Sequence, residues 1–346
     1  MGKQSWGILL LCALLVITAG CGTAGNQGGG NGEEGFSAGL VTDTGGLNDE
    51  SFNQTAWEGM TRAKKELGAD IKPLESKRDD DYIPNLTKFA REKRDIIWGI
   101  GFKFNKAIPD VAKQFPDQKF GIVDDSLGGN IPENVVAVTF KEEEGSFLMG
   151  VIAGSMTQSD KVGFIGGITS PLIKKFESGF RAGVKAVNPD AKVTVAYAES
   201  FTDVAKGRSL AANMYNGGTD IIFHAAGGVG KGLFDEVKTR KKGKYWAIGV
   251  DMDQSGLAPD HTLSSMVKRV DVAVFDIMKD IKENDQFPGG KEVQLGLKEG
   301  GVGLAENTDK HVPEKVMKKV EDYKQQIIDG KIEVPSTEKE LKDFKG

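Results

Sequence analysis

The sequence predicts an α/β chain made of two similar lobes, each an open parallel sheet with flanking helices. From residue 36 onward, short apolar runs of strand length alternate with amphipathic stretches of helical length. Such alternation is typical of parallel sheets joined by right-handed crossovers. The pattern recurs at an offset of 124 residues. A chain of 346 residues also has room for two domains of about 100–200 residues, each with its own core.

The first lobe carries the clearest elements. Continuous apolar runs predict buried parallel strands at residues 38–41, 96–100 and 120–123. Amphipathic spacing predicts helices over 51–67 and 81–91. Ser51 is the expected N-cap of the first of these helices, and Gly68 is its expected stop.

The second lobe is indicated by an internal repeat. The matched residues keep one order along the chain: Phe52 with Phe176, Gly59 with Gly183, Glu75 with Glu199, Asp79 with Asp203, and, after small insertions, Asp95 with Asp220 and Asp124 with Asp251. This order and the nearly constant offset favour two lobes of one design.

Three later segments are expected to carry the chain between the lobes. The strand-like run 135–140 leads into a helix over 142–155, and 263–268 leads into a helix over 270–282. A third crossing is expected at 292–297, and a C-terminal helix over 313–329 would pack on the second lobe. The predicted division is a signal peptide at 1–20, a tether at 21–35, a first lobe at 36–140 plus 268–291, and a second lobe at 141–267 plus 292–346. Lobes joined by a three-strand hinge predict a ligand cleft between them.

The N-terminus has the features of an export signal. Lys3 precedes an apolar run over residues 6–17 and the small residues Thr18-Ala19-Gly20. Together with Cys21 these small residues resemble a bacterial lipobox, although Leu or Val is usual where Thr18 stands. The glycine-rich stretch 22–32 reads as a flexible tether. We therefore expect acylation of Cys21 and anchoring on the extracytoplasmic face of a bacterial membrane. The alternative is a plain signal peptide with an incidental cysteine.

Composition and motifs argue against several other functions. The net charge is −5 and no dense basic block occurs, so nucleic acid is not an expected partner. The three histidines are scattered without metal-ligand spacing, and no Gly-x-Ser-x-Gly elbow occurs. The glycine run 227–232 breaks the Walker pattern at Ala225 and Gly232, which favours a tight strand-to-helix turn. We predict no catalytic residue, no metal and no cofactor, and we expect a monomer.

Candidate ligand-binding residues come from the carboxyl ends of the predicted strands, where open parallel sheets bind ligands. Phe52 and Phe176 occupy matched positions, in the expected first turn of a helix after a glycine-rich loop, and could stack on a flat ligand. Asp124 and Asp251 could accept hydrogen bonds from vicinal hydroxyls, and Lys268 could add a cationic donor. The alternatives are core phenylalanines, solvated loop charges and a hinge ion pair.

Several motifs resemble the Bmp (basic membrane protein) family of PnrA-like nucleoside-binding lipoproteins. The most specific are VTDTGGLNDESFNQTAWEG at 41–59 and VKRVDVA at 267–273. The similarity continues in GFIGG at 163–167, KFESGFRAG at 175–183, AAGG at 225–228 and GVDMDQ at 249–254.

The resemblance implies a type I periplasmic-binding-protein fold that captures purine nucleosides by hinge closure and passes them to the permease of an ABC transporter. It implies stacking of the base between Phe52 and Phe176, with Phe201 as the alternative second ring, and reading of the base edge by Asn53. The ribose contacts that it implies are Asp124, Gly227, Gly228, Asp251 and Lys268, with Asp43 and Asn48 as further contributors from the first loop. The alternatives are a sugar- or autoinducer-binding lipoprotein of the same fold, a surface enzyme of nucleoside metabolism, and an adhesin or signalling lipoprotein.

Overall fold

The computed structural model describes residues 35–345, so the predicted signal peptide, Cys21 and the tether up to residue 34 lie outside the described residues. The strands are β1 (Ser37–Thr42), β2 (Asp70–Glu75), β3 (Ile96–Ile100), β4 (Phe120–Val123), β5 (Val135–Phe140), β6 (Lys161–Gly166), β7 (Lys192–Tyr197), β8 (Ile221–Ala225), β9 (Trp246–Asp251), β10 (Thr262–Lys268), β11 (Lys291–Leu295) and β12 (Val302–Leu304). The α-helices are α1 (Phe52–Leu67), α2 (Tyr82–Arg91), α3 (Ala107–Gln114), α4 (Glu142–Met156), α5 (Pro171–Val187), α6 (Val204–Asn216), α7 (Gly230–Val237), α8 (Val270–Asn284), α9 (Glu314–Ile328) and α10 (Glu338–Asp343).

These strands form two six-stranded open sheets of the same order, and the predicted α/β fold is confirmed. The first sheet runs β2-β1-β3-β4-β5-β11 with every pairing parallel. The second runs β7-β6-β8-β9-β10-β12 and is parallel except where β12 pairs with β10. Corresponding strands follow one another in the same order along the chain, which is the structural counterpart of the sequence repeat.

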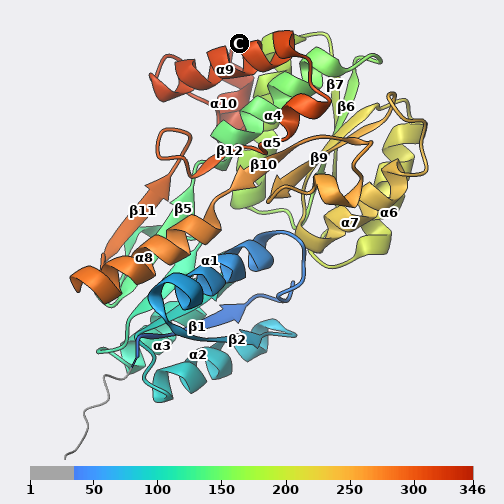
Figure 1. Cartoon of the computed structure of the whole chain (residues 1–346). Coiled ribbons are helices and arrows are strands. Elements are labelled where there is room, and N and C mark those ends of the chain that lie inside the picture. Colours follow the sequence, from blue (N-terminus) through green and yellow to red (C-terminus); the bar gives the residue numbers. More distant parts are fainter. Residues whose placement is uncertain (1–34, 346) are drawn as a thin grey trace, which may run out of the picture. The chain divides into compact units, whose positions relative to one another are not determined.

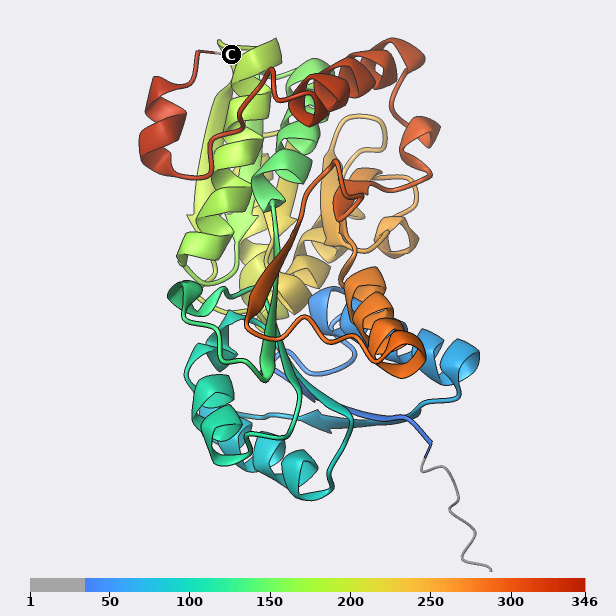
Figure 2. The ribbon, with the colours of Figure 1, turned by 90° about the vertical axis from the view of Figure 1, so that its left-hand side faces the viewer.

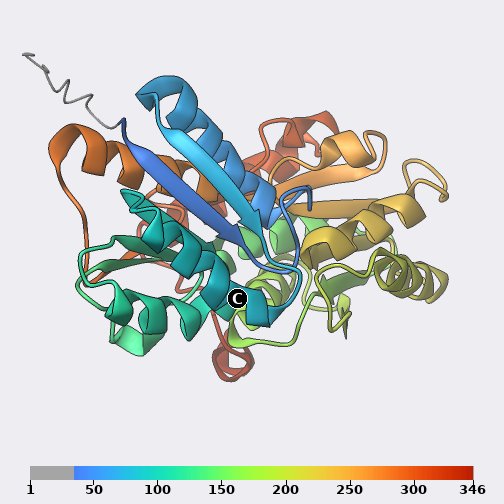
Figure 3. The ribbon, with the colours of Figure 1, turned by 90° about the horizontal axis from the view of Figure 1, so that it is seen from below.

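Helices cover both faces of each sheet, as Figure 1 shows. In the first lobe α1 and α8 lie side by side on one face, and α2 and α3 cover the other (Figures 2 and 3). In the second lobe α4 packs on α5 and α9, while α6 pairs with α7. We use "first lobe" and "second lobe" for the two sheets with these helices.

The chain passes between the sheets three times, after β5, after β10 and between β11 and β12. β11 pairs with β5 of the first sheet, although the sequence-based division puts residues from 292 onward in the second lobe. The lobe boundaries by residue number remain a prediction.

Close packing between helices explains the matched glycines of the repeat, Gly59 and Gly183. A Cβ at Gly59 of α1 would collide with the carbonyl oxygen of Asp271 in α8. A Cβ at Gly183 of α5 would collide in the same way with the carbonyl oxygen of Phe147 in α4. In each lobe the helix after the first strand of the sheet therefore approaches the helix that follows a chain crossing so closely that only glycine fits.

The capping prediction for α1 is wrong in its chemistry. Ser51 stands at the N-cap position, but its hydroxyl makes no capping hydrogen bond. Asp49 does this instead: its Oδ1 accepts from the backbone N–H groups of Ser51 and Gln54, and its Oδ2 accepts from that of Asn53. The Asp49 carboxylate satisfies N–H groups that have no partner within the helix, and the Ser51 hydroxyl is left for another contact. At the other end, Gly68 ends the helix as predicted, with φ 66°.

Candidate functional site

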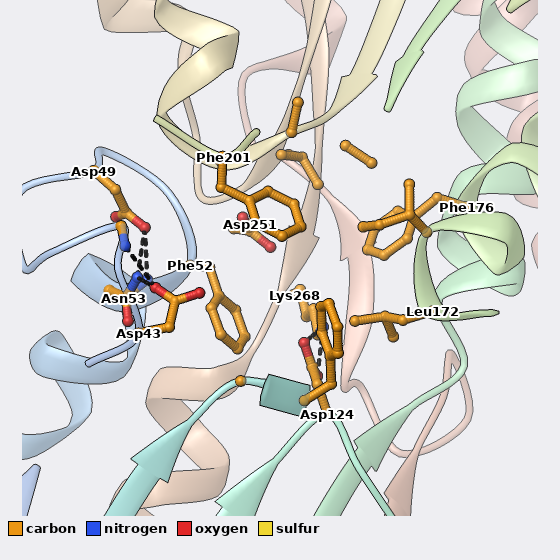
Figure 4. A pocket seen from close by; sticks show the side chains of 18 residues that line it. Asp43, Asp49, Phe52, Asn53, Asp124, Leu172, Phe176, Phe201, Asp251 and Lys268 are labelled. Atoms are coloured by element: carbon orange, nitrogen blue, oxygen red, sulfur yellow. Dashed lines mark hydrogen bonds and ion pairs between the residues drawn. The ribbon is translucent and has the colours of Figure 1, made fainter. Parts of the chain in front are cut away.

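A pocket lined by residues of both lobes lies between the carboxyl ends of their strands. Together with the open solvent at its mouth, the space between its walls amounts to about 550 Å³. Figure 4 shows aromatic rings and carboxylates from both lobes facing this space. Most of the predicted site residues line it: Asp43, Phe52, Asn53, Asp124, Phe176, Gly227, Asp251 and Lys268.

Two predicted residues do not line the pocket. Asn48 lies in the loop before α1, and its backbone oxygen accepts a hydrogen bond from Lys231 Nζ at 2.9 Å. Gly228 belongs to a 3₁₀ turn (Gly227–Val229) beside the pocket, where its backbone lies next to the carbonyl oxygen of Phe201. Only its neighbour Gly227 reaches the lining.

The aromatic rings surround the ammonium group of Lys268. Its Nζ lies 5.1 Å from the ring centroid of Phe52 and 5.6 Å from that of Phe176, within cation–π range of both rings. Phe176 lies in the second turn of α5, not in the predicted first turn, because that helix begins at Pro171. Phe176 is 3% exposed and also lines the pocket. It is therefore a core residue and a wall of the pocket at the same time.

Further apolar residues outside the predicted set complete the walls. Leu172 and Ile173 reach the pocket from the first turn of α5. Phe102 lines it from the first lobe, and its ring meets that of Phe201 of the second lobe edge-on, with centroids 6.4 Å apart. The matched glycine-rich loops pointed to Phe176, but no repeat signal marked Phe102.

Lys268 is the centre of a buried ion cluster. Its Nζ lies 2.6 Å from Asp124 and 3.0 Å from Glu142, and Lys175 contacts the same glutamate at 3.3 Å. Burial lowers the pKa of Lys268, but the carboxylates of Asp124, Glu142 and Asp251 outweigh it and raise the net pKa above the usual lysine value. Glu142 escaped prediction because an acidic first turn usually indicates a solvated helix N-terminus.

The two predicted hydroxyl acceptors occupy equivalent backbone positions. Asp124 follows β4 and Asp251 ends β9, and both have left-handed backbones, with φ 71° and 68°. Burial raises the pKa of Asp124 to about 6 against the opposing effect of Lys268. Burial likewise raises the pKa of Asp251 to about 7, again opposed by Lys268. The Ser51 hydroxyl, which does not cap α1, donates to Asp251 from the opposite lobe.

The loop before α1 presents an amide with a fixed orientation. Asn53 Nδ2 donates to Asp43 at 2.8 Å and to Asp49 at 3.2 Å, which identifies the nitrogen of this amide. Its Oδ1 is buried and has no hydrogen-bond partner among residues 35–345. Burial raises the pKa of Asp43, while hydrogen bonds from Asn53 and Gly45 lower it. A buried acceptor without a partner costs free energy, so a ligand N–H group that reached Asn53 Oδ1 would gain a hydrogen bond.

No group of three or more His, Cys, Asp or Glu side chains between residues 35 and 345 is placed to hold a metal ion. Over the same residues, no helix is both long enough and apolar enough to cross a membrane.

Comparisons with known proteins identify the family. Residues 36–338 match the model of the family described as Bmp, ABC transporter substrate-binding protein PnrA-like. The chain is 43% identical to the CD4+ T-cell-stimulating antigen of Listeria innocua, over 97% of this chain and 99% of that protein. It is 38% identical to the ABC transporter nucleoside-binding protein BmpA of Lactococcus lactis, over 94% and 96%.

A solved structure shares the fold. An ABC transporter solute-binding protein from Aeropyrum pernix superposes with a TM-score of 0.80 at 27% identity, and the match covers 89% of this chain and 96% of that one. The chain therefore belongs to the Bmp family and is a substrate-binding protein of an ABC transporter rather than an enzyme.

Proposed function

We propose that the protein captures purine nucleosides in this pocket by closure of its two lobes and delivers them to the permease of its transporter. The observation that carries the proposal is the meeting, in one pocket, of the Phe52 and Phe176 rings with the carboxylates of Asp124 and Asp251. Aromatic rings bind the flat base by stacking, and carboxylates accept hydrogen bonds from vicinal ribose hydroxyls. The relative from Lactococcus lactis is named a nucleoside-binding protein, which supports the same ligand class.

The charges of the pocket favour a nucleoside over a nucleotide. Four carboxylates line it, those of Asp43, Asp49, Asp124 and Asp251, against the single cation Lys268. That cation already pairs with two carboxylates, so little positive charge remains for a phosphate group. We expect nucleoside monophosphates to bind much more weakly than the corresponding nucleosides.

The unpartnered acceptor of Asn53 favours a base edge with N–H donors. The N1–H and 2-amino groups of guanine offer such donors, hypoxanthine offers N1–H alone, and adenine presents an acceptor at N1. We therefore expect guanosine to bind more tightly than inosine, and inosine more tightly than adenosine. An acceptor facing an acceptor leaves both groups unsatisfied and weakens binding.

Calorimetric titration tests the proposal. The protein is unfolded and refolded to remove any carried-over ligand, then titrated with guanosine, inosine, adenosine, cytidine, guanosine monophosphate, ribose and guanine. Saturable binding of purine nucleosides, with ribose and guanine much weaker, is the expected result. Binding of a free sugar without nucleosides would assign the protein to sugar capture instead.

A matched pair of variants locates the site. Asp251→Asn keeps the size of the side chain and removes its charge, and we expect a loss of affinity of more than tenfold. Asp260→Asn removes an exposed carboxylate whose one ion pair within residues 35–345 is with Lys242, and we expect no change. Equal affinities of the two variants would contradict the assignment of Asp251.

The membrane attachment is a separate part of the proposal. We propose that acylation of Cys21 anchors the protein on the extracytoplasmic face and that the protein acts as a monomer. Cys21→Ser in cells fed labelled palmitate is expected to abolish labelling and release the protein from membranes. Persistent labelling would place the acyl group elsewhere.

A further inference from the structure

The loop before α1 contacts two residues of the second lobe outside the pocket. Within residues 48–51, the backbone oxygens of Asn48 and Glu50 accept hydrogen bonds from Lys231 and Gln254 of the second lobe. Neither Lys231 nor Gln254 lines the pocket. These contacts therefore join the lobes without using groups that face a ligand.

Hydrogen bonds within the second lobe fix the orientation of the Gln254 side chain. The side-chain Oε1 of Gln254 accepts from the backbone N–H of Val250 and contacts Nε2 of His224, both at 2.9 Å. The backbone N–H of Gln254 donates to Ser265 Oγ at 3.0 Å. Because Oε1 accepts from Val250, Nε2 of His224 must carry the proton that it shares with Oε1. Gln254 is 3% exposed, so the side chain has little freedom left to lose.

The crossing hydrogen bond then follows from this fixed orientation. With Oε1 occupied inside the second lobe, the amide nitrogen of Gln254 points out of that lobe and donates to the backbone oxygen of Glu50 at 2.7 Å. Glu50 has φ 55°, a left-handed conformation that is uncommon for a residue with a side chain.

Lys231 supplies the second crossing contact. It lies in the first turn of α7, and its Nζ donates to the backbone oxygen of Asn48 at 2.9 Å and lies 3.9 Å from the Glu50 carboxylate. Its side chain is 29% exposed, so it sits at the rim of the contact and not in a core.

We propose that Lys231 and Gln254 form a closure latch, in which they hold residues 48–51 and stabilise the closed arrangement of the lobes without touching the ligand. For its effect on nucleoside affinity, this inference rests on the proposed function. A contact made only in the closed state shifts the open–closed equilibrium by its own free energy. Loss of the latch must then weaken every ligand by the same factor, whereas loss of a pocket contact changes selectivity.

Lys231→Met tests the latch, and Lys238→Met is the matched control. Lys238 caps the other end of the same helix, and among the described residues its one ion pair is with Asp235. We expect Lys231→Met to weaken guanosine, inosine and adenosine by one common factor of about three- to tenfold, mainly through faster dissociation. The control should leave all three affinities unchanged.

A second readout needs no ligand. Cys12 and Cys21 are the two cysteines of the chain, so with both replaced by serine, Lys88→Cys on α2 and Ser209→Cys on α6 accept a fluorophore pair across the lobes. Single-molecule energy transfer then reports closing and opening of the ligand-free protein. We expect Lys231→Met to shorten the lifetime of the closed state by about the same factor by which it lowers the nucleoside affinities.

The outcomes separate the two proposals. Unchanged closed-state lifetimes in Lys231→Met would overturn the latch, as would affinity losses that differ between nucleosides, since these would place Lys231 in ligand recognition. A wild-type protein that binds no nucleoside would overturn the proposed function, and the ligand-free lifetimes would still decide the latch.

Discussion

Lys268→Met removes the ammonium group between the carboxylates of Asp124 and Glu142, and we expect it to destabilise the fold. Lys268 is 1% exposed and the two carboxylates 4% and 0%, so water cannot replace the lost charge. Removing one partner from a buried ion pair costs about 3–5 kcal/mol, a large share of the roughly 5–15 kcal/mol that stabilises a folded domain. Methionine keeps the length of the side chain, so the cavity left behind contributes little.

The loss should depend on pH in a defined direction. In the wild-type protein Lys268 opposes the rise that burial causes in the pKa of Asp124. Without that ammonium the folded-state pKa of Asp124 moves further above the usual aspartate value of 3.8. A folded state with a raised carboxyl pKa binds more protons than the unfolded state, so its stability falls as pH rises. The deficit is therefore expected to be largest near about pH 8 and smallest near about pH 5.

Urea unfolding at the two pH values measures this deficit. Lys175→Met is the control, because Lys175 contacts the same Glu142 at 3.3 Å but is 29% exposed, and we expect it to lose about 1 kcal/mol or less. A loss below about 1 kcal/mol for Lys268→Met at the higher pH would refute the reasoning. An equal loss at both pH values would show that the carboxylates are not the cause.

Three further predictions follow from the helix contacts and the pocket. Asp49→Ala removes the acceptor of three backbone N–H groups at the start of α1. It should lower the free energy of unfolding, measured by heat or urea, by about 1–2 kcal/mol, and an unchanged value would contradict the capping role of Asp49. Gly59→Ala should cost about 1–3 kcal/mol in the same measurement, because its Cβ meets the Asp271 carbonyl, whereas a gain would mean that α8 moves aside freely. Nucleoside affinity should fall by up to about tenfold per pH unit below 7, because the ligand-free protein then holds a proton on Asp251. That proton must leave before the carboxylate can accept hydrogen bonds from the hydroxyl groups. Titration in buffers of different ionisation enthalpy should detect the released proton, and an affinity that does not change with pH would contradict this role of Asp251.

The sequence predicts the buried strands well because a strand covered on both faces is a continuous apolar run. β3 and β4 coincide with their predicted bounds, and β1 extends the predicted run by one residue at each end. The edge strands β2 and β7 escaped prediction for the opposite reason. β2 (DIKPLE) has mostly exposed or half-exposed positions and contains Pro73, which an edge strand tolerates and a central strand does not.

The site was less accessible to sequence reasoning than the fold. Residues at strand ends are predictable from topology, and Asp124 and Asp251 reach the pocket as expected. The residues that contact Asp124 and Asp251 are not predictable in this way, because hydrogen bonds and ion pairs between the lobes join residues far apart in the chain. Ser51 looked like a helix cap and instead meets Asp251, 200 residues away. Glu142 was expected only as the first residue of a helix, and its side chain is fully buried against Lys268.

The left-handed backbones of Asp124 and Asp251 affect how this pocket should be mutated. Asparagine tolerates positive φ at least as well as aspartate, since its short polar side chain can bond to its own backbone, whereas the same conformation costs alanine roughly 1–2 kcal/mol. An alanine scan would therefore add backbone strain to lost recognition at these two positions and exaggerate their part in binding. Asparagine leaves the strand ends as they are and reports the carboxylate alone.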